Sequence, residues 1–362
     1  MRPPFEPLTV VHVVFSSRIA GGERHCIDLA HAQAALGHRV HVIGSAGSAV
    51  AGALSDGVSF HGLSLPLLRG WRVAALARRL GADVCHGHLG PACKAVAHVT
   101  NAARIGTLHV GYKAHHHARL DGLICVNRAQ YDGLPAGEAK SRVIYNWAPE
   151  RPRAAGKVSD LRSELDLAPH QLLVGSVGRL HPSKGMDLLI TAFKAHAPSD
   201  AVLAILGEGP DEAALHSLAA GDPRIRLLGY RDDVDQALQA FDLFVSPSRE
   251  EAFPLAILEA MRAGRPVLST ATQGPLEMLA GQPARLVPVN DADALGRALA
   301  EEIDRLRGLA PADRATRYAT SAYDRDHAVA RTLAFYRDVI RDVAGRAVPF
   351  EEQDEAYAGW RA

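Results

Sequence analysis

Short apolar runs that end in a polar or glycine-containing loop, and then lead into a helical pattern, recur along this chain. Residues 8–15 and 172–178 are clear examples, because valine and leucine dominate both runs. Such continuous runs are typical of strands that are buried on both faces of a parallel sheet. Strands that alternate with helices in this way predict an α/β fold with doubly wound, Rossmann-like domains. The length of 362 residues allows two domains of about 150–200 residues each.

The alternation is interrupted between residues 141 and 158, where proline, arginine, alanine and glycine replace the apolar runs. A change of composition of this kind is typical of a link between domains. A last helical pattern follows the second series of strands. We therefore expect an N-terminal domain over residues 1–147, a linker over 148–160, a second domain over 161–325, and a C-terminal helix and tail over 326–362.

Composition and short motifs argue against several classes of protein. Lys plus Arg and Asp plus Glu both number 40, so the overall charge does not favour a nucleic-acid partner. No apolar run approaches the roughly 18 residues of a membrane span, and the first residues do not resemble a signal peptide. The four cysteines lack Cys-x-x-Cys spacing, which favours reduced thiols. The adjacent histidines 115–117 cannot share one helix face, so we expect no metal there.

Two carboxylates, Glu251 and Glu259, flank the predicted start of a helix. Pro254 lacks an N–H group and has a preset φ, so it fits the first helical turn. A helix N-terminus has free N–H groups and attracts anions, whereas carboxylates accept hydrogen bonds from hydroxyl groups. The combination suits a ligand with both phosphate and hydroxyl groups, such as a nucleotide sugar. The alternative is that both glutamates are solvated charges on a loop and a helix.

Two cations, Arg179 and Lys184, lie in the loop after the strand predicted at 172–178. Two positive charges at the carboxyl end of a strand suit a diphosphate, although they can also be ordinary surface charges. In a parallel sheet, loops 179–185, 231–234 and 248–254 would lie at the same edge. We therefore expect these loops to form one ligand site.

Glycines and histidines mark a second candidate site in the first half. Gly21 and Gly22 would let the backbone approach a ligand at a helix start, or they simply form a tight turn. His88 and His109 each end a predicted strand, where ligands of α/β sheets bind. Both are candidates to line a cleft, unless they are structural groups inside the domain.

The helical pattern over residues 67–80 is basic on one side. It suits a helix that lies on anionic lipid, or a crossover helix with a solvated basic side, which is the interpretation that we favour. Trp71 lies among the basic residues. The basic residues are Arg69, Arg72, Arg78 and Arg79.

The order of these motifs resembles the retaining glycosyltransferases of family 4, which have the GT-B fold. The likeness extends from about residue 8 to residue 340, and within the family residues 117–122 and 231–234 are similar to bacterial lipopolysaccharide-core sugar transferases. It implies two Rossmann-like domains that face each other across a cleft, an acceptor-side domain followed by a nucleotide-sugar-binding domain, and a C-terminal helix that can cross back to the first domain. The residues that carry the likeness are Gly21-Gly22-Glu23, His109, Gly178-Arg179, Lys184-Gly185, Gly207-Glu208-Gly209-Pro210, Glu251, Glu259-Ala260-Met261 and Gly264-Arg265-Pro266-Val267.

The resemblance assigns roles to the side chains at matching positions. Arg179 and Lys184 would bind the donor diphosphate and neutralise the leaving group. Glu251 would contact the donor sugar and Glu259 the ribose, and His109 would lie near the transferred sugar.

Backbone groups complete the implied donor site. Those near the start of the helix that follows Pro254 would help to hold phosphate and sugar, and the loop at 231–234 would touch the base. The backbone at Gly21 and Gly22 would approach the phosphates. Ala252 and Pro254 stand where the family often has glycine, and we expect activity to survive both. The positions implied in this way are Gly21, Gly22, Val234, Phe253, Pro254 and Leu255.

The resemblance also implies the reaction. A hexosyltransferase of this family moves a sugar from a nucleotide diphosphate sugar, here a UDP-sugar, to a glycan or lipid-linked acceptor of lipopolysaccharide or another envelope polysaccharide. It retains the anomeric configuration, and neither a metal nor a cofactor is implied. The protein would work in the cytoplasm, with a peripheral place on the inner face of the membrane. A GT-B sugar-nucleotide epimerase and a non-catalytic nucleotide-sugar-binding protein are the alternatives.

Overall fold

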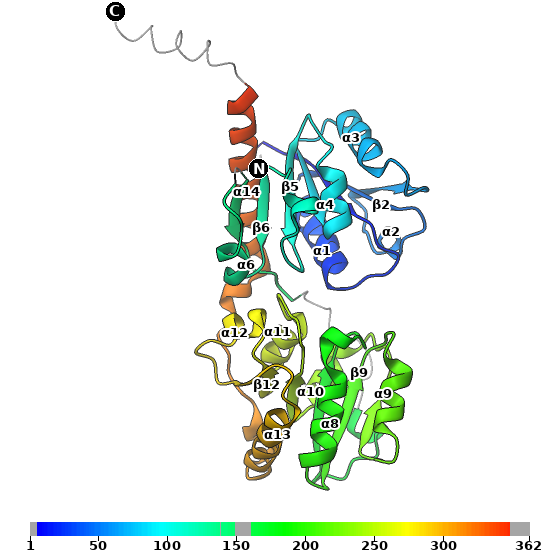
Figure 1. The fold of residues 1–362 in the computed structure, drawn as a ribbon, viewed down its shortest axis with the longest axis vertical. Helices are drawn as coiled ribbons and strands as arrows, with labels where there is room; N and C mark the ends of the chain where they lie inside the picture. Colours follow the sequence, from blue (N-terminus) through cyan, green and yellow to red (C-terminus); the bar gives the residue numbers. More distant parts are fainter. Residues whose placement is uncertain (1–5, 138, 149–160, 348–362) are drawn as a thin grey trace, which may run out of the picture. The chain divides into compact units, whose positions relative to one another are not determined.

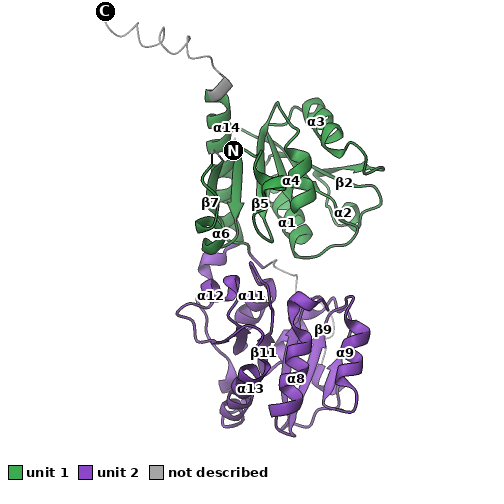
Figure 2. Cartoon of the chain, in the orientation of Figure 1, with its two compact units in different colours: residues 1–146, 325–362 green, residues 147–324 purple. Residues whose placement is uncertain are grey.

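The computed structural model describes residues 6–137, 139–148 and 161–347. The chain divides into two compact units (Figure 2). Unit 1 consists of the residues up to Asn146 together with the segment from Arg325 onward, and unit 2 is Trp147–Asp324. The predicted linker lies almost entirely outside the described residues, as does the predicted tail after residue 347.

Unit 1 contains a seven-stranded sheet in the order β3-β2-β1-β4-β5-β6-β7, in which all neighbouring strands are parallel (Figure 1). The side chains of β1, β4 and β6 are buried along their whole length, as expected for strands covered on both faces. The connections reverse direction between β1 and β4, which are neighbours. The strands are β1 (Thr9–Val14), β2 (Arg39–Ser45), β3 (Val58–Leu63), β4 (Val84–His88), β5 (Ala103–Leu108), β6 (Gly122–Cys125) and β7 (Lys140–Val143).

The C-terminal helix α14 (Arg325–Ala347) packs on the sheet of unit 1. A side chain at Gly122 would collide with Val339, and the Tyr336 hydroxyl lies 2.6 Å from Nδ1 of His86. The predicted return of this helix to the first domain is therefore confirmed. The other helices of unit 1 are α1 (Gly21–Ala35), α2 (Ala49–Gly52), α3 (Arg69–Leu80), α4 (Gly90–Val96), α5 (Ala114–His117) and α6 (Arg128–Asp132).

Strand β7 lies where the sequence predicts that regular structure stops. Its side chains are half-buried, and α14 covers it through ion pairs of 2.9 Å, Lys140 with Asp342 and Arg142 with Asp338. Charged partners that are distant in sequence replace the apolar contacts of an inner strand. A search for apolar runs therefore misses this strand.

Unit 2 contains a six-stranded parallel sheet in the order β10-β9-β8-β11-β12-β13 (Figure 1). Its connections reverse direction between the neighbours β8 and β11. Both sheets thus have the doubly wound plan that the sequence predicts. The strands are β8 (Leu172–Val177), β9 (Ala201–Leu206), β10 (Ile225–Leu227), β11 (Leu243–Ser246), β12 (Val267–Thr270) and β13 (Arg285–Val287).

Helices surround the sheet of unit 2, and α13 is capped by Asp291, whose Oδ1 accepts a hydrogen bond of 2.8 Å from the backbone N–H of Ala294. Within the described part of the chain, every helix is too short or too polar to cross a lipid bilayer. The helices are α7 (Leu161–Glu164), α8 (Met186–His196), α9 (Glu212–Ala219), α10 (Val234–Ala240), α11 (Leu255–Arg262), α12 (Gln273–Met278) and α13 (Ala292–Arg307).

Candidate functional site

Two loops of unit 2 meet at the point where its sheet reverses direction. The β8 loop, residues 178–185, and the β11 loop, residues 247–254, leave the carboxyl ends of neighbouring parallel strands. The connections diverge at such a switch point and open a crevice, which is the usual ligand site of doubly wound sheets. The predicted donor-binding residues Arg179, Lys184 and Glu251 all lie on these two loops.

Glycines let the backbones around this crevice approach closely. Gly185 has φ of 65°, and a Cβ there would lie 2.1 Å from the carbonyl oxygen of Pro247. A Cβ at Gly207, which has φ of 141°, would lie 1.9 Å from the carbonyl oxygen of Gly178. Both contacts exclude a side chain, and the positive φ angles favour glycine independently. The glycines therefore fix how the β8 loop packs against its neighbours.

Arg249 joins the two loops, a role that the sequence analysis does not assign to it. Its backbone N–H donates to the carbonyl oxygen of Ser183 at 2.8 Å, and its guanidinium donates to both oxygens of Asp187 at 2.7 Å. These hydrogen bonds lower the pKa of Asp187. Arg249 is followed by two glutamates in the sequence, and only the fold shows that its partner Asp187 lies at the start of α8.

Lys184 and Glu251 are brought together across the two loops. The ammonium group donates a hydrogen bond to Oε2 of the carboxylate, and 29% of the Lys184 side chain and 15% of the Glu251 side chain are exposed. Arg179 is exposed on the same loop as Lys184, and its guanidinium makes no hydrogen bond or ion pair with the described residues. One anionic and two cationic side chains therefore lie on the two loops at the switch point.

The β11 loop leads into α11. Pro254 is the residue before the helix, with φ of −82° and ψ of 91°, so the helix begins one residue later than the sequence predicts. Phe253 is buried against Tyr323, with ring centroids 5.6 Å apart in an edge-to-face arrangement. Leu255 and Glu259 are half-buried on α11.

The loop at 231–234 lies at the same sheet edge but follows β10, which is separated from β8 by β9. The Arg231 guanidinium forms ion pairs with Asp233 at 2.6 Å and with Glu164 at 2.8 Å. Val234 is buried in the first turn of α10. Any contact of this loop with a ligand would therefore involve its backbone rather than the Val234 side chain.

Unit 1 places the predicted glycine pair and His109 side by side. Gly21 and Gly22 form the first turn of α1, directly after the loop that follows β1. A Cβ at Gly22 would lie 3.5 Å from Cγ of His109 and 3.1 Å from a side-chain carbon of Leu89. The backbone N–H of Ala20 donates to the buried Glu23 carboxylate at 3.0 Å, which fixes the start of the helix.

His109 belongs to a cluster of imidazoles that the sequence analysis does not identify. Nε2 of His109 lies 3.2 Å from Nδ1 of His88, and Nε2 of His88 lies 3.0 Å from Nδ1 of His12. His88 is completely buried, which agrees with the alternative that it is a structural group inside the domain, whereas His109 is half-buried. Desolvation lowers the pKa of His12 and of His109 to about 4, and that of His88 well below its usual value. These rings are therefore uncharged near neutral pH.

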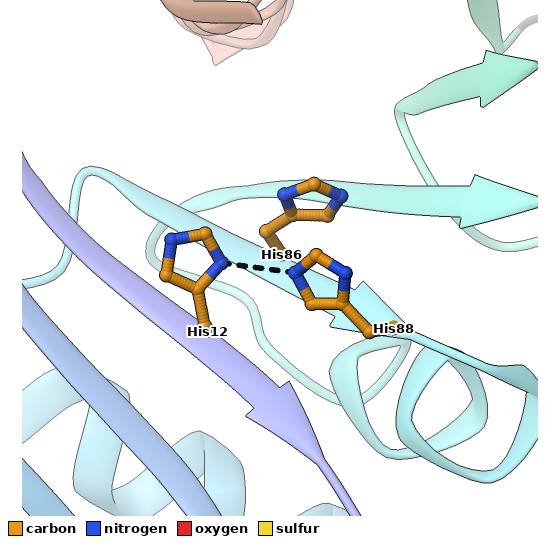
Figure 3. A group of neighbouring side chains, drawn as sticks. All are labelled: His12, His86 and His88. Atoms are coloured by element: carbon orange, nitrogen blue, oxygen red, sulfur yellow. Dashed lines mark hydrogen bonds between the residues drawn. The ribbon is translucent and has the colours of Figure 1, made fainter. Parts of the chain in front are cut away.

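His12, His86 and His88 lie close enough for one nitrogen of each to bind a common metal ion (Figure 3). His86 uses both of its nitrogens in other contacts, Nδ1 with Tyr336 at 2.6 Å and Nε2 with Thr107 at 2.7 Å. The dashed line in Figure 3 marks the contact between His12 and His88. Hydrogen bonds thus account for the ring positions without a metal.

A surface at the start of α3 combines exposed apolar groups with basic ones. Arg69 lies 4.5 Å above the Phe15 ring, and Arg72 donates to the carbonyl oxygen of Leu65 at 3.1 Å. Arg78 and Arg79 are exposed in the last turn. The large apolar side chains here are between 60% and 71% exposed, and they are Leu65, Leu67, Leu68 and Trp71.

Both halves of the chain match glycosyltransferase family models. Residues 19–149 match Glycosyltransferase Family 4, and residues 171–305 match Glycosyl transferases group 1. These ranges coincide with most of unit 1 before α14 and with most of unit 2. The predicted family resemblance is confirmed in both halves.

Curated relatives include enzymes of polysaccharide synthesis. The lipopolysaccharide core biosynthesis glycosyltransferase LpsE of Rhizobium meliloti is 34% identical over 163 residues, which are 44% of this chain and 46% of that protein. The mannosyltransferase LpsB of the same organism is 27% identical over 56% of this chain and 61% of that protein. The chain spans about half the length of the curated relatives it matches.

Solved structures confirm the fold over nearly the whole chain. Anabaena Alr3699/HepE, in complex with UDP and glucose, has a TM-score of 0.72 at 21% identity and covers 90% of this chain and 99% of its own. WaaG, a glycosyltransferase involved in lipopolysaccharide biosynthesis, has a TM-score of 0.66 at 17% identity over 93% of this chain and 100% of its own. At this level of identity the likeness concerns the fold alone.

Proposed function

We infer that this chain transfers a sugar from a nucleotide diphosphate sugar to a glycan or lipid-linked acceptor of an envelope polysaccharide such as lipopolysaccharide. The chain belongs to the glycosyltransferases that the two family models describe. The observation that carries this proposal is the meeting of Lys184 and Glu251 at the switch point of the unit that matches the group 1 model. A UDP-sugar is the proposed donor, since HepE has been solved with UDP-glucose.

The charged groups of unit 2 divide the proposed work. Arg179 and Lys184 bind the diphosphate, Glu251 accepts hydrogen bonds from the sugar hydroxyls, and Glu259 accepts them from the ribose. The ion pair between Lys184 and Glu251 holds both groups in place before the donor binds. Groups fixed in this way stabilise developing charge without reorganising at the moment of reaction.

The backbone of unit 2 contributes at the start of α11, where the region of Phe253, Pro254 and Leu255 helps to hold the phosphate and sugar. The first N–H groups of a helix have no partner within the helix and attract anions. The backbone beside Val234 touches the base. In unit 1, Gly21 and Gly22 contribute backbone groups toward the phosphates, and His109 contributes its imidazole toward the transferred sugar.

The proposed reaction retains the anomeric configuration. The bond between the anomeric carbon and the phosphate oxygen breaks, and the acceptor hydroxyl attacks the same face of the sugar. The leaving diphosphate accepts the proton of that hydroxyl, so no side-chain nucleophile is needed. Arg179 and Lys184 supply the positive charge that stabilises the diphosphate, which is why we propose a reaction without a divalent metal.

The decisive experiment separates transfer from the two alternative functions. Purified protein is incubated with UDP-, GDP- and ADP-sugars, with and without lipopolysaccharide-core or lipid-linked acceptors, and free nucleotide and products are measured. Acceptor-dependent release of nucleotide with a glycosylated product supports a transferase. A free C2-epimerised product from a UDP-sugar alone would instead establish an epimerase, and a thermal shift without turnover with any acceptor would leave a binding protein.

We also propose that the surface at the start of α3 contacts an anionic membrane, which would place the protein on the inner face of the cytoplasmic membrane. Exposed leucines and a tryptophan beside arginines suit the interface of such a membrane. Replacing Leu67 and Trp71 by serine should reduce co-sedimentation with anionic vesicles, whereas serine at Leu36, which is also exposed, should not. Equal binding by both variants would exclude this surface.

A further inference from the structure

His109 ends a line of hydrogen-bonded side chains that runs into the interior of unit 1. Its Nε2 contacts Nδ1 of His88 at 3.2 Å, Nε2 of His88 contacts Nδ1 of His12 at 3.0 Å, and Nε2 of His12 contacts Oε1 of Gln33 at 2.8 Å. The four residues come from the end of β5, from β4, from β1 and from α1. His12, His88 and Gln33 are all completely buried.

We propose that Gln33, His12 and His88 position His109 by holding it in one tautomer, with its proton on Nε2 and a lone pair on Nδ1. In the structure Gln33 turns its Oε1 toward His12, and a carbonyl oxygen can only accept a hydrogen bond, so in this orientation the proton of His12 is on Nε2. A neutral imidazole has one proton, so Nδ1 of His12 accepts from Nε2 of His88. Nε2 of His88 therefore carries the proton of that ring, and its Nδ1 accepts from Nε2 of His109. Nδ1 of His109 is then left with a lone pair and acts as a hydrogen-bond acceptor.

This polarity requires that the rings are neutral, and their surroundings make them so. Burial removes the rings from water and opposes a positive charge on each of them. The rings of His25 and His86 lie next to the line, at centroid distances of 5.2 Å from His109 and 4.2 Å from His88. A charge on one ring would therefore repel any charge on the next.

A metal ion bound by His12, His86 and His88 is the competing interpretation. Such an ion would break the contact between His12 and His88 and one of the two hydrogen bonds of His86. The three candidate ligands include no carboxylate to offset the charge of the ion. The hydrogen bonds among these side chains explain the positions of the three rings without the loss of any of these contacts.

This tautomer determines which hydrogen bond His109 can make with a donor sugar under the proposed function. A lone pair on Nδ1 suits a hydroxyl group of a donor sugar, which would donate its hydrogen bond to the ring. The meaning of the tautomer for transfer rests on the proposed function, whereas the tautomer itself does not. The two can therefore be tested separately.

The test is a long-range ¹H–¹⁵N correlation spectrum of the full chain labelled on its histidines, recorded near neutral pH, with His109 assigned through a His109→Asn variant. We expect the Nε2–H tautomer for His109. The Nδ1–H tautomer, an imidazolium signal, or zinc that co-purifies in stoichiometric amount and shifts the signals of His12 and His88 would overturn the proposal.

Gln33→Met tests the origin of the polarity, because methionine fills a similar volume without the acceptor oxygen. We expect a mixture of His109 tautomers and a loss of turnover of about fivefold to tenfold, the factor that one ordinary hydrogen bond is worth. Gln130→Met is the matched control, since Gln130 is a buried glutamine of the same unit that bonds the backbone N–H of Val126. An unchanged single tautomer in Gln33→Met would contradict the role of Gln33. If neither variant folds, the spectrum of the unaltered chain still decides the tautomer.

Discussion

The two units share a doubly wound plan but place different chemistry beside their switch points. Near β8 and β11 of unit 2, the groups are charged and partly exposed, as Lys184 and Glu251 illustrate. Near β1 and β4 of unit 1, the groups are imidazoles, and His12 and His88 are completely buried. The order of the strands positions a site in both units, but it does not determine the kind of site.

Burial explains the difference. A charge that keeps contact with water remains ionised at little cost, so unit 2 can offer cations to an anionic diphosphate. An imidazole in the interior loses its charge, because desolvation lowers its pKa, and it then acts as a neutral donor and acceptor. Under the proposed function, the charged side chains that the donor contacts therefore come from unit 2, whereas the side chain that unit 1 contributes, His109, is neutral.

Removing one of the two cationic side chains from the proposed donor site of unit 2 should have the largest effect on activity. Lys184→Ala deletes the ammonium group proposed to stabilise the leaving diphosphate, and we expect turnover to fall roughly 10²–10³-fold. The melting temperature should change little, because a partly exposed ion pair contributes little stability. Initial rates with a sugar donor and thermal unfolding measure the two effects.

Lys194→Ala provides the matched control for this experiment. Lys194 is exposed on α8 of the same unit and donates to the carbonyl oxygen of Leu218 at 2.9 Å. Its removal should leave turnover unchanged. If Lys184→Ala also kept full turnover, the assignment of the site to the crevice between β8 and β11 would be refuted.

Lowering the pH should reduce the free energy of unfolding of unit 1 more than that of unit 2. The pKa of His12 is about 4 in the folded chain against an ordinary value of 6.5, so the unfolded chain binds more protons once the pH falls below 6.5. The contribution of the neutral ring is complete above that pH and is lost between pH 6.5 and 4, which for His12 alone amounts to roughly 3 kcal/mol. Unit 1 should therefore lose stability first.

Native-state hydrogen exchange, corrected for the intrinsic rate, can follow this loss in the intact chain. Amides of β1 and β4 should lose protection between about pH 7 and about pH 5, and those of β8 and β11 should keep it. The described strands of unit 2 contain no histidine, so they serve as the internal control. Equal losses in both units would show that the imidazoles are not the cause.

Much of unit 2 follows from local sequence. The apolar run at 172–178 predicts β8, the mostly apolar residues 241–245 are equally typical of a buried strand and form β11, and parallel strands bring their following loops to one edge. The sequence alone therefore predicts that Arg179, Lys184 and Glu251 lie on neighbouring loops, and the structure places them there. The glycines at 185 and 207 mark loops, although the carbonyl groups that exclude their side chains are visible only in the fold.

The features that sequence reasoning misses depend on distant partners. An apolar pattern reports which residues are buried, but it does not report which polar groups meet inside. His86 bonds Tyr336, which lies 250 residues further along the chain, and Arg249 bonds Asp187 across 62 residues. The charged strand β7 is missed for the same reason, because its cover comes from α14.

The glycines at the two switch points should give the smallest but most direct contrast. Gly185→Ala forces a left-handed backbone on alanine and pushes its Cβ toward the carbonyl oxygen of Pro247, so we expect a loss of about 2 kcal/mol. Gly22→Ala meets only side-chain atoms at 3.1 Å or more, in a helix where alanine is favoured, and should change stability by less than about 1 kcal/mol. Urea unfolding of both variants measures the difference. Equal losses would mean that the backbone at Gly22 is packed as tightly as the backbone at Gly185. The two units would then differ in the charge and burial of their side chains, but not in how closely their glycine loops are packed.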